Sequence, residues 1–214
     1  MKRILCLLFA VALFLVSCKK EEPDPNMVAS AGDFSIYMGE NGSYNVRYNS
    51  KISDIYLSKI RNYTPSLRSV DFNKDEKMDA LLIEYQLISR LTHGQKISLL
   101  VADEMGNVEK IDCPLTVKDL SERISFKKQD KSTVVVTVGG KEHSFAVMDN
   151  KEFESGELDE RIEYSVVGEE IIATTRVGLR FKGQAHSSKY GYIDAILQYK
   201  NNKFAFTDAR YRNY

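Results

Sequence analysis

The chain has few of the residues that build covalent cross-links and metal centres. Its 214 residues include three cysteines, three histidines and no tryptophan. Cys6 and Cys18 lie in or directly after an N-terminal apolar run, which leaves Cys113 alone in the rest of the chain, and a single cysteine cannot cross-link the fold by itself. Because Cys113 precedes Pro114 among apolar neighbours, we interpret it as a small buried hydrophobic residue rather than a nucleophile.

The motifs of several common catalytic sites are also missing. The sequence has no zinc-ligand spacing, glycine-rich phosphate loop, nucleophile elbow or catalytic cysteine-histidine set. His93, His143 and His186 fall in different predicted elements, and we interpret them as independent turn and strand residues, with a shared metal site as the alternative. None of these patterns indicates an enzyme.

An excess of charge of either sign is absent too, since 30 Lys and Arg oppose 30 Asp and Glu. The first 17 residues contain Lys2 and Arg3 and no acid, so their removal leaves 28 basic against 30 acidic residues, a formal charge of −2. No basic patch stands out in the sequence, and nucleic acid is therefore not a predicted partner.

The N-terminus has the composition of a targeting segment. Lys2 and Arg3 precede an apolar run over residues 4–16, which is shorter than the roughly 20 residues that a membrane-spanning helix needs. We predict that residues 1–17 form a signal peptide that is removed.

The four residues Leu15-Val16-Ser17-Cys18 resemble the lipobox of bacterial lipoproteins. The resemblance implies cleavage before Cys18 and acylation of its sulfur and amino group, which would anchor the chain to a membrane. The charged residues 19–22 resemble the signal that sends lipoproteins of Bacteroidetes-type bacteria to the outer face of the outer membrane. We therefore expect an outer-membrane lipoprotein on the periplasmic or cell-surface face. The alternative is that Cys18 ends an ordinary signal peptide or a short anchor helix.

The mature chain divides into a short tether and one domain. Residues 18–31 contain Pro23 and Pro25 and little apolar content, which is typical of an extended spacer. With 43% hydrophobic residues, the remaining chain can fill one core, and we predict a single β-rich domain over residues 32–214.

Alternation with a period of two dominates this domain and predicts an all-β fold, mainly antiparallel, with few short helices. A Gly139-Gly140 turn predicts the clearest hairpin. Residues 116–124 have helical spacing, residues 51–61 fit a short helix or an irregular strand, residues 92–95 suggest a turn, and residues 150–160 suggest a polar loop. Strands are predicted at residues 34–38, 43–48, 80–88, 96–102, 108–111, 133–138, 141–147, 161–167, 170–180 and 192–199.

Oxygen-bearing side chains recur at nearly every second position from residue 71 to residue 79, directly before an apolar strand. Ca²⁺ takes six to eight hard oxygen ligands, and such spacing can bring them to one centre. The candidate ligands are Asp71, Asn73, Asp75 and Asp79 at loop positions 1, 3, 5 and 9, with the main-chain carbonyl of Lys77 near position 7. The alternative is a solvated acidic turn whose side chains bond to their own backbone.

The loop departs from an EF-hand, because Glu76 replaces the glycine at position 6 and Leu82 replaces the glutamate at position 12. Residues 70–82 instead resemble the FG-GAP and VCBS repeats of β-propeller proteins, in which a D-F-N-x-D-G-x-x-D loop precedes a strand. The resemblance implies Ca²⁺ bound at Asp71, Asn73, Asp75 and Asp79. Only one complete copy of the loop is present, so we expect a small or degenerate β-propeller-like domain, with a two-sheet β-sandwich as the alternative.

Two functions remain open from the sequence. The preferred hypothesis is a non-enzymatic, outer-membrane-anchored binding or structural lipoprotein with one structural Ca²⁺ loop, whose partner is a glycan or a protein. Twelve tyrosines and ten phenylalanines suit a binding surface, and equally an ordinary core. The alternative is an extracytoplasmic, glycan-directed hydrolase that uses carboxylates of residues 152–160 in a cleft.

Overall fold

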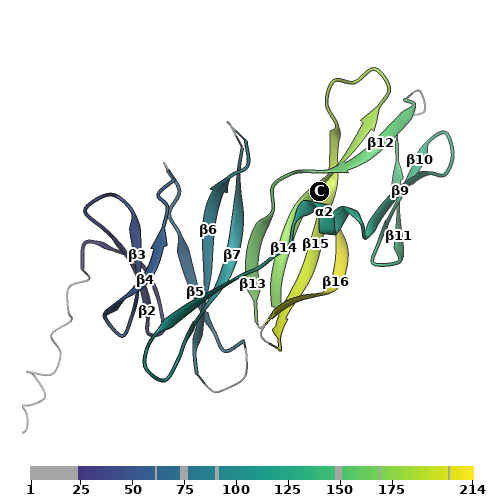
Figure 1. The fold of residues 1–214 in the computed structure, drawn as a ribbon. Helices are drawn as coiled ribbons and strands as arrows, with labels where there is room; N and C mark the ends of the chain where they lie inside the picture. The colour runs from purple at the N-terminus through teal and green to yellow at the C-terminus, as the bar shows by residue number, and fades with distance from the viewer. Residues whose placement is uncertain are drawn as a thin grey trace, which may run out of the picture.

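The computed structural model describes residues 24–60, 62–72, 77–89, 92–147, 151–168, 170–201 and 203–214. Within these residues it contains sixteen strands and one short helix, and the strands form four antiparallel sheets (Figure 1). The predicted all-β, mainly antiparallel class is confirmed. The predicted signal peptide and Cys18 lie outside the described residues.

Sheet 1 is a four-stranded meander at the N-terminus of the described chain. Its strands are β1 (Met27–Ala31), β2 (Phe34–Met38), β3 (Tyr44–Tyr48) and β4 (Lys51–Leu57). β1 falls within residues 18–31, which the sequence assigned to the tether. Strand pairing therefore begins at Met27, five residues before the predicted start of the domain at residue 32. The segment whose structure the sequence left open is a strand in β4.

Sheet 2 is a second meander, formed by β5 (Ser66–Val70), β6 (Asp79–Leu87), β7 (His93–Ala102) and β8 (Val108–Asp112). The first six residues of β6 are all buried, because this strand is covered on both faces. Within it, residues 80–83 form the continuous apolar run that is typical of a strand covered on both faces.

The turn predicted at residues 92–95 is wrong, because β7 already begins at His93, which pairs with Leu87. Gly94 suggested a turn, yet its φ is not positive. A Cβ on Gly94 would lie 2.5 Å from Cδ1 of Ile88, so this glycine provides space for a packed side chain. The actual turn closes earlier, with the Ile88 N–H donating to the Thr92 carbonyl at 2.9 Å.

Helix α2 (Val117–Ser121) connects sheet 2 to sheet 3, within the segment predicted to be helical. Thr116 and Asp119 form a reciprocal capping box at its N-terminus, and Leu120 is buried in the core. Sheet 3 consists of β9 (Ile124–Lys128), β10 (Thr133–Val138) and β11 (Lys141–Ala146).

The turn between β10 and β11 is formed by Gly139 and Gly140, whose φ angles are +56° and +78°. Positive φ at both central residues is what a tight two-residue hairpin turn requires. The hairpin predicted here is confirmed, with Val138 paired to Lys141 across it.

Sheet 4 consists of β12 (Phe153–Leu158), β13 (Glu163–Val167), β14 (Glu170–Phe181), β15 (Ser188–Lys200) and β16 (Lys203–Asn213). β12 and β13 pair one after the other along the long strand β14. The loop predicted at residues 150–160 is therefore wrong over β12. Its charged composition hid an edge strand whose backbone is satisfied by β14 and whose side chains are mostly only partly buried.

The sheets pack in the spatial order 1, 2, 4, 3. In Figure 1 the purple and blue strands of sheets 1 and 2 are followed by the green and yellow strands of sheet 4 and then by β9, β10 and β11 of sheet 3. Ala80, Leu82 and Leu100 of sheet 2 pack against sheet 1. Leu81 and Leu99, on the opposite face of sheet 2, pack against sheet 4. A continuous series of cores thus links the strands from β1 to β16.

Sheet 4 curls so that one face covers two neighbours. Ile171 and Ala173 of β14 pack toward sheet 2, whereas Val177 and Leu179 on the same face pack toward sheet 3. Two successive meanders packed face to face are consistent with both the propeller-like and the sandwich description. On the opposite face of sheet 4, most side chains of β14 are partly exposed.

Candidate functional site

The ends of the predicted calcium loop are brought together by the pairing of β5 and β6. Val70 pairs with Asp79, which places loop positions 1 and 9 at the same end of the two strands. The Asp79 side chain points back to the start of the loop, because its Oδ2 accepts a hydrogen bond from the Phe72 N–H at 3.3 Å. Asn73, Asp75 and Glu76 lie outside the described residues, so only Asp71, Lys77 and Asp79 of the candidate set are placed.

Asp79 is both buried and hydrogen-bonded. It is 3% exposed, and its bond from the Phe72 N–H is one of the contacts that stabilise a carboxylate in such a place. The pKa of Tyr199 in sheet 4 is raised by burial and, secondarily, by Asp79. Within the described residues no group of three or more His, Cys, Asp or Glu side chains is arranged to hold a metal.

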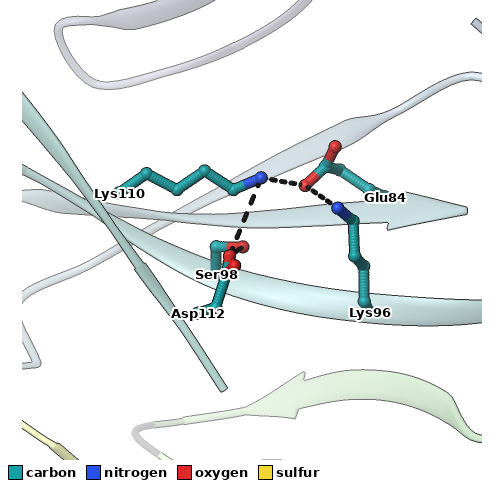
Figure 2. A network of polar contacts seen from close by, with 5 residues as sticks. All are labelled: Glu84, Lys96, Ser98, Lys110 and Asp112. Carbon is teal, nitrogen blue, oxygen red and sulfur yellow. Dashed lines mark hydrogen bonds and ion pairs between the residues drawn. The ribbon is translucent and has the colours of Figure 1, made fainter. Parts of the chain in front are cut away.

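A second set of charged residues crosses sheet 2 on the face toward sheet 1 (Figure 2). Lys110 Nζ lies 2.6 Å and Lys96 Nζ 3.4 Å from Glu84 Oε2, and Ser98 donates to Asp112 Oδ1 at 2.6 Å. Two ammonium groups thus face two carboxylates. Because opposite charges from three neighbouring strands pair, this cluster supports the register of β6, β7 and β8.

Cys113 borders a groove of about 600 Å³ between sheet 2, α2 and β13. It is half-buried and packs against the core, and burial raises the pKa of its thiol. A raised pKa lowers the thiolate fraction. These features support the interpretation of Cys113 as a small hydrophobic residue.

The three histidines lie in separate surroundings. The His93 ring lies 4.8 Å from the Tyr63 ring, and the His143 ring lies 5.1 Å from the Tyr211 ring. His186 is exposed in the turn after β14. The structure therefore does not bring them together.

The solvent-facing side of sheet 4 carries a polar groove of about 570 Å³, which we call the sheet 4 groove. It crosses β12, β14 and the start of β15. Its charged lining residues are Glu157, Asp159, Glu160, Arg161, Arg176, Arg180 and Lys189. Gly178 forms part of the floor, and a Cβ there would lie 2.7 Å from Ser187 Oγ, so glycine lets the loop after β14 fold over the sheet.

Ion pairs hold two of these arginines in place. Arg180 donates to Glu157 at 2.9 Å, and Arg161 binds both carboxylate oxygens of Asp159 at 3.1 and 2.8 Å. The hydrogen bonds from Arg161 hold the pKa of Asp159 below its usual range. Asp159 also accepts from the Arg161 N–H at 3.0 Å, which shapes the break between β12 and β13.

The remaining two cations of the groove are Arg176 and Lys189. Neither forms a salt bridge or a side-chain hydrogen bond in the part of the chain that the structure describes. Arg176 pairs across the strands with Tyr192, and both line a small hollow of about 10 Å³ that Asp159 and Glu163 also line. The charge of Arg176 contributes to lowering the pKa of Asp159.

Tyr192 belongs to an aromatic stack beside the groove. Its ring is nearly parallel to that of Tyr214, with centroids 5.6 Å apart and an interplanar angle of 11°, and the Arg212 guanidinium lies 4.7 Å from its centroid. Asp194 fixes Arg212 at 2.9 Å. Tyr214 is 73% exposed. The exposed face of sheet 4 thus combines a groove, arginines and aromatic rings.

The sequence pointed to the acidic loop and not to this face. Its residues come from β12, β14, β15 and β16, and they meet only through the pairing of those strands. Alternation in residues 170–180 places Arg176 and Arg180 on one side of a strand, which is the one available signal.

No protein-family model matches the chain, and no curated protein or solved structure matches it significantly. None of the described helices is long and apolar enough to cross a membrane.

Proposed function

We propose that the chain is a lipid-anchored, non-enzymatic binding module of the outer membrane that holds a glycan on the exposed face of sheet 4. The observation that carries the proposal is the sheet 4 groove beside the Tyr192–Tyr214 stack. Aromatic rings on an exposed sheet offer flat apolar surface, and paired arginines and carboxylates offer fixed donors and acceptors for hydroxyl groups.

The order of the sheets supports a role at a surface. Residue Met27 begins β1 nine residues after Cys18, and nine residues span at most about 30 Å. An acyl anchor at Cys18 would keep sheet 1 near the membrane. Sheets 4 and 3, at the other end of the series, would then face outward.

Calcium at the acidic loop has a structural role in this proposal. The ligands are Asp71, Asn73, Asp75 and Asp79 with the carbonyl of Lys77. A cation there would bind Asp71 and Asp79 together and so hold the paired ends of β5 and β6, next to which Phe72 packs in the core shared with sheet 4.

The ion pair of Asp159 argues against its use as the general acid of a hydrolase. A general acid of this kind needs a raised pKa, whereas the hydrogen bonds from Arg161 lower the pKa of Asp159. Asp159 is therefore an acceptor for the donors of a ligand.

An array of neutral and acidic oligosaccharides, probed with the full chain in mild detergent, tests the proposal. We expect binding to at least one glycan class and a loss of at least tenfold in affinity for the double variant Tyr192→Leu, Tyr214→Ala. Arg47→Gln is the matched control, because Arg47 stacks 3.8 Å over Tyr37 on the distant sheet 1. No binding to any glycan, or equal loss in the control, would contradict the proposal.

A further inference from the structure

We infer that the outward face of sheet 1 lies on the surface of the membrane that holds the acyl anchor. The inference rests on the proposed acylation of Cys18 and adds a second contact, which the folded domain itself makes with lipid. It is carried by a row of apolar and aromatic side chains at the point where the chain enters sheet 1.

This row crosses the four strands of sheet 1 on the face that turns away from sheet 2. Met27 pairs with Tyr37, Tyr37 with Asn45, and Asn45 with Tyr56, and we call these four residues the outer row. Val46, the next residue of β3, points the other way into the core shared with sheet 2. Sheet 1 stands at one end of the series of sheets, so its outward face has no neighbouring sheet among the described residues (Figure 1).

Large apolar side chains are exposed on this face. Tyr56 is 66% exposed, and Ile52, which pairs with Arg47 beside the outer row, is 55% exposed. In the part of the chain that the structure describes, no side chain of the outer row belongs to a hydrophobic core. Tyrosine combines an apolar ring with a polar hydroxyl, and such side chains gather at the boundary between lipid and water. The face therefore suits the headgroup region of a membrane.

Charge on the face is balanced. The Arg47 guanidinium lies 3.8 Å from the centroid of the Tyr37 ring, and the exposed Asp54 follows between Ile52 and Tyr56 along β4. One cation and one acid leave no net charge, so the contact with lipid depends on apolar surface and not on electrostatic attraction. Added salt should therefore change it little.

The position of the anchor indicates what covers this face. The Met27 N–H donates to the Asp24 carbonyl and the Met38 N–H donates to the Asn26 carbonyl, both at 2.9 Å, so the chain enters sheet 1 beside the outer row. Asp24 is six residues after Cys18, and six residues span at most about 22 Å. An acylated Cys18 would keep the outer row within reach of lipid. Because the second contact is then intramolecular, a small apolar face is enough to make it.

The chain contains no tryptophan, which allows a direct test of the contact. The acylated full chain is reconstituted in phosphatidylcholine vesicles whose acyl chains carry bromine, which quenches a tryptophan that touches lipid. Tyr56→Trp places the only tryptophan in the outer row. Tyr214→Trp is the matched control, because Tyr214 is 73% exposed and follows β16 in sheet 4. We expect brominated lipid to lower the emission of Tyr56→Trp at least twofold and to leave the control nearly unchanged.

Two further measurements examine the physical basis of the contact. Ile52→Ser, added to Tyr56→Trp, should reduce the quenching, because it removes the second exposed apolar side chain of the face. Raised salt should leave the quenching unchanged. Quenching that disappears in salt would contradict an apolar contact. Both substituted tyrosines are exposed, so the two tryptophan variants should melt at the temperature of the parent chain.

The outcomes separate this inference from the anchor on which it rests. A parent chain that does not float with the vesicles would overturn both. If the chain floats but Tyr56→Trp and Tyr214→Trp are quenched equally, or not at all, the anchor stands and the docked face is overturned. Emission of Tyr56→Trp that is not quenched but moves to shorter wavelength as protein concentration rises would mean that a second copy covers the face, which would also overturn the inference.

Discussion

At the residue scale, charged side chains are paired differently in the interior and on the exposed face. Glu84 is buried and lies between two lysines, whereas Glu157 and Asp159 are partly exposed and each is paired with one arginine. Removing one partner of a buried pair is costly, because the other charge stays in a poorly solvated place. Removing one partner of an exposed pair changes the free energy of unfolding little.

Glu84→Gln should therefore lower the free energy of unfolding by about 1–3 kcal/mol, because Lys110 keeps its charge at a side-chain exposure of 20%. Urea unfolding of the full chain measures the effect. Glu152→Gln is the control, since its pair with Lys182 is more than 60% exposed on both sides, and we expect a change within about 0.5 kcal/mol. Equal effects of the two substitutions would show that the cluster in sheet 2 is not stabilising.

Asp159 should give stability a dependence on acid pH. Its pKa is lowered in the folded state by Arg161, so its contribution is present above the unfolded pKa, near 4, and is lost as pH falls through the folded pKa. We expect Asp159→Asn to shift the urea midpoint downward at about pH 7, and the gap to the parent to close below about pH 4. A gap that stays constant down to low pH would contradict the ion pair with Arg161.

At the element scale, strand periodicity predicted most of the fold, and its failures have physical causes. Gly94 suggested a turn although it makes room for Ile88. β12 was not predicted because its two glutamates, serine and glycine resemble the composition of a polar loop. The loop from residue 71 to 79 was visible because its ligand spacing is local. The sheet 4 groove could not be predicted from the sequence, because Arg176 and Tyr192 meet only through long-range strand pairing.

If the loop from residue 71 to residue 79 binds Ca²⁺, as we propose, stability should depend on the metal. In a thermal melt of the full chain, saturating Ca²⁺ at about a hundredfold excess over the dissociation constant should add roughly 2.7 kcal/mol relative to chelator. Asp75→Ala should remove this response. Asp103→Asn is the matched control: it alters an acidic turn in which Asp103 accepts from the N–H groups of Met105 and Asn107, and it should lower both melts equally. A parent chain indifferent to Ca²⁺ would rule out the metal.

At the scale of the whole molecule, the four sheets form a series with the N-terminal strand at one end. If Cys18 is acylated, this order separates the membrane from the sheet 4 groove. Metabolic labelling with an alkyne fatty acid should mark the parent chain and Cys113→Ala but not Cys18→Ala. A label that persists in Cys18→Ala, or that never appears, would contradict the anchor.

The central claim is that ligand binds on the exposed face of sheet 4. Hydrogen exchange of the full chain, measured by mass spectrometry with and without a glycan that the array shows to bind, tests it most directly. We predict slower exchange confined to β12, the second half of β14 and the start of β15, with sheet 1 unchanged. Slower exchange centred on sheet 1 or on the groove beside Cys113, or no change at saturating ligand, would contradict it.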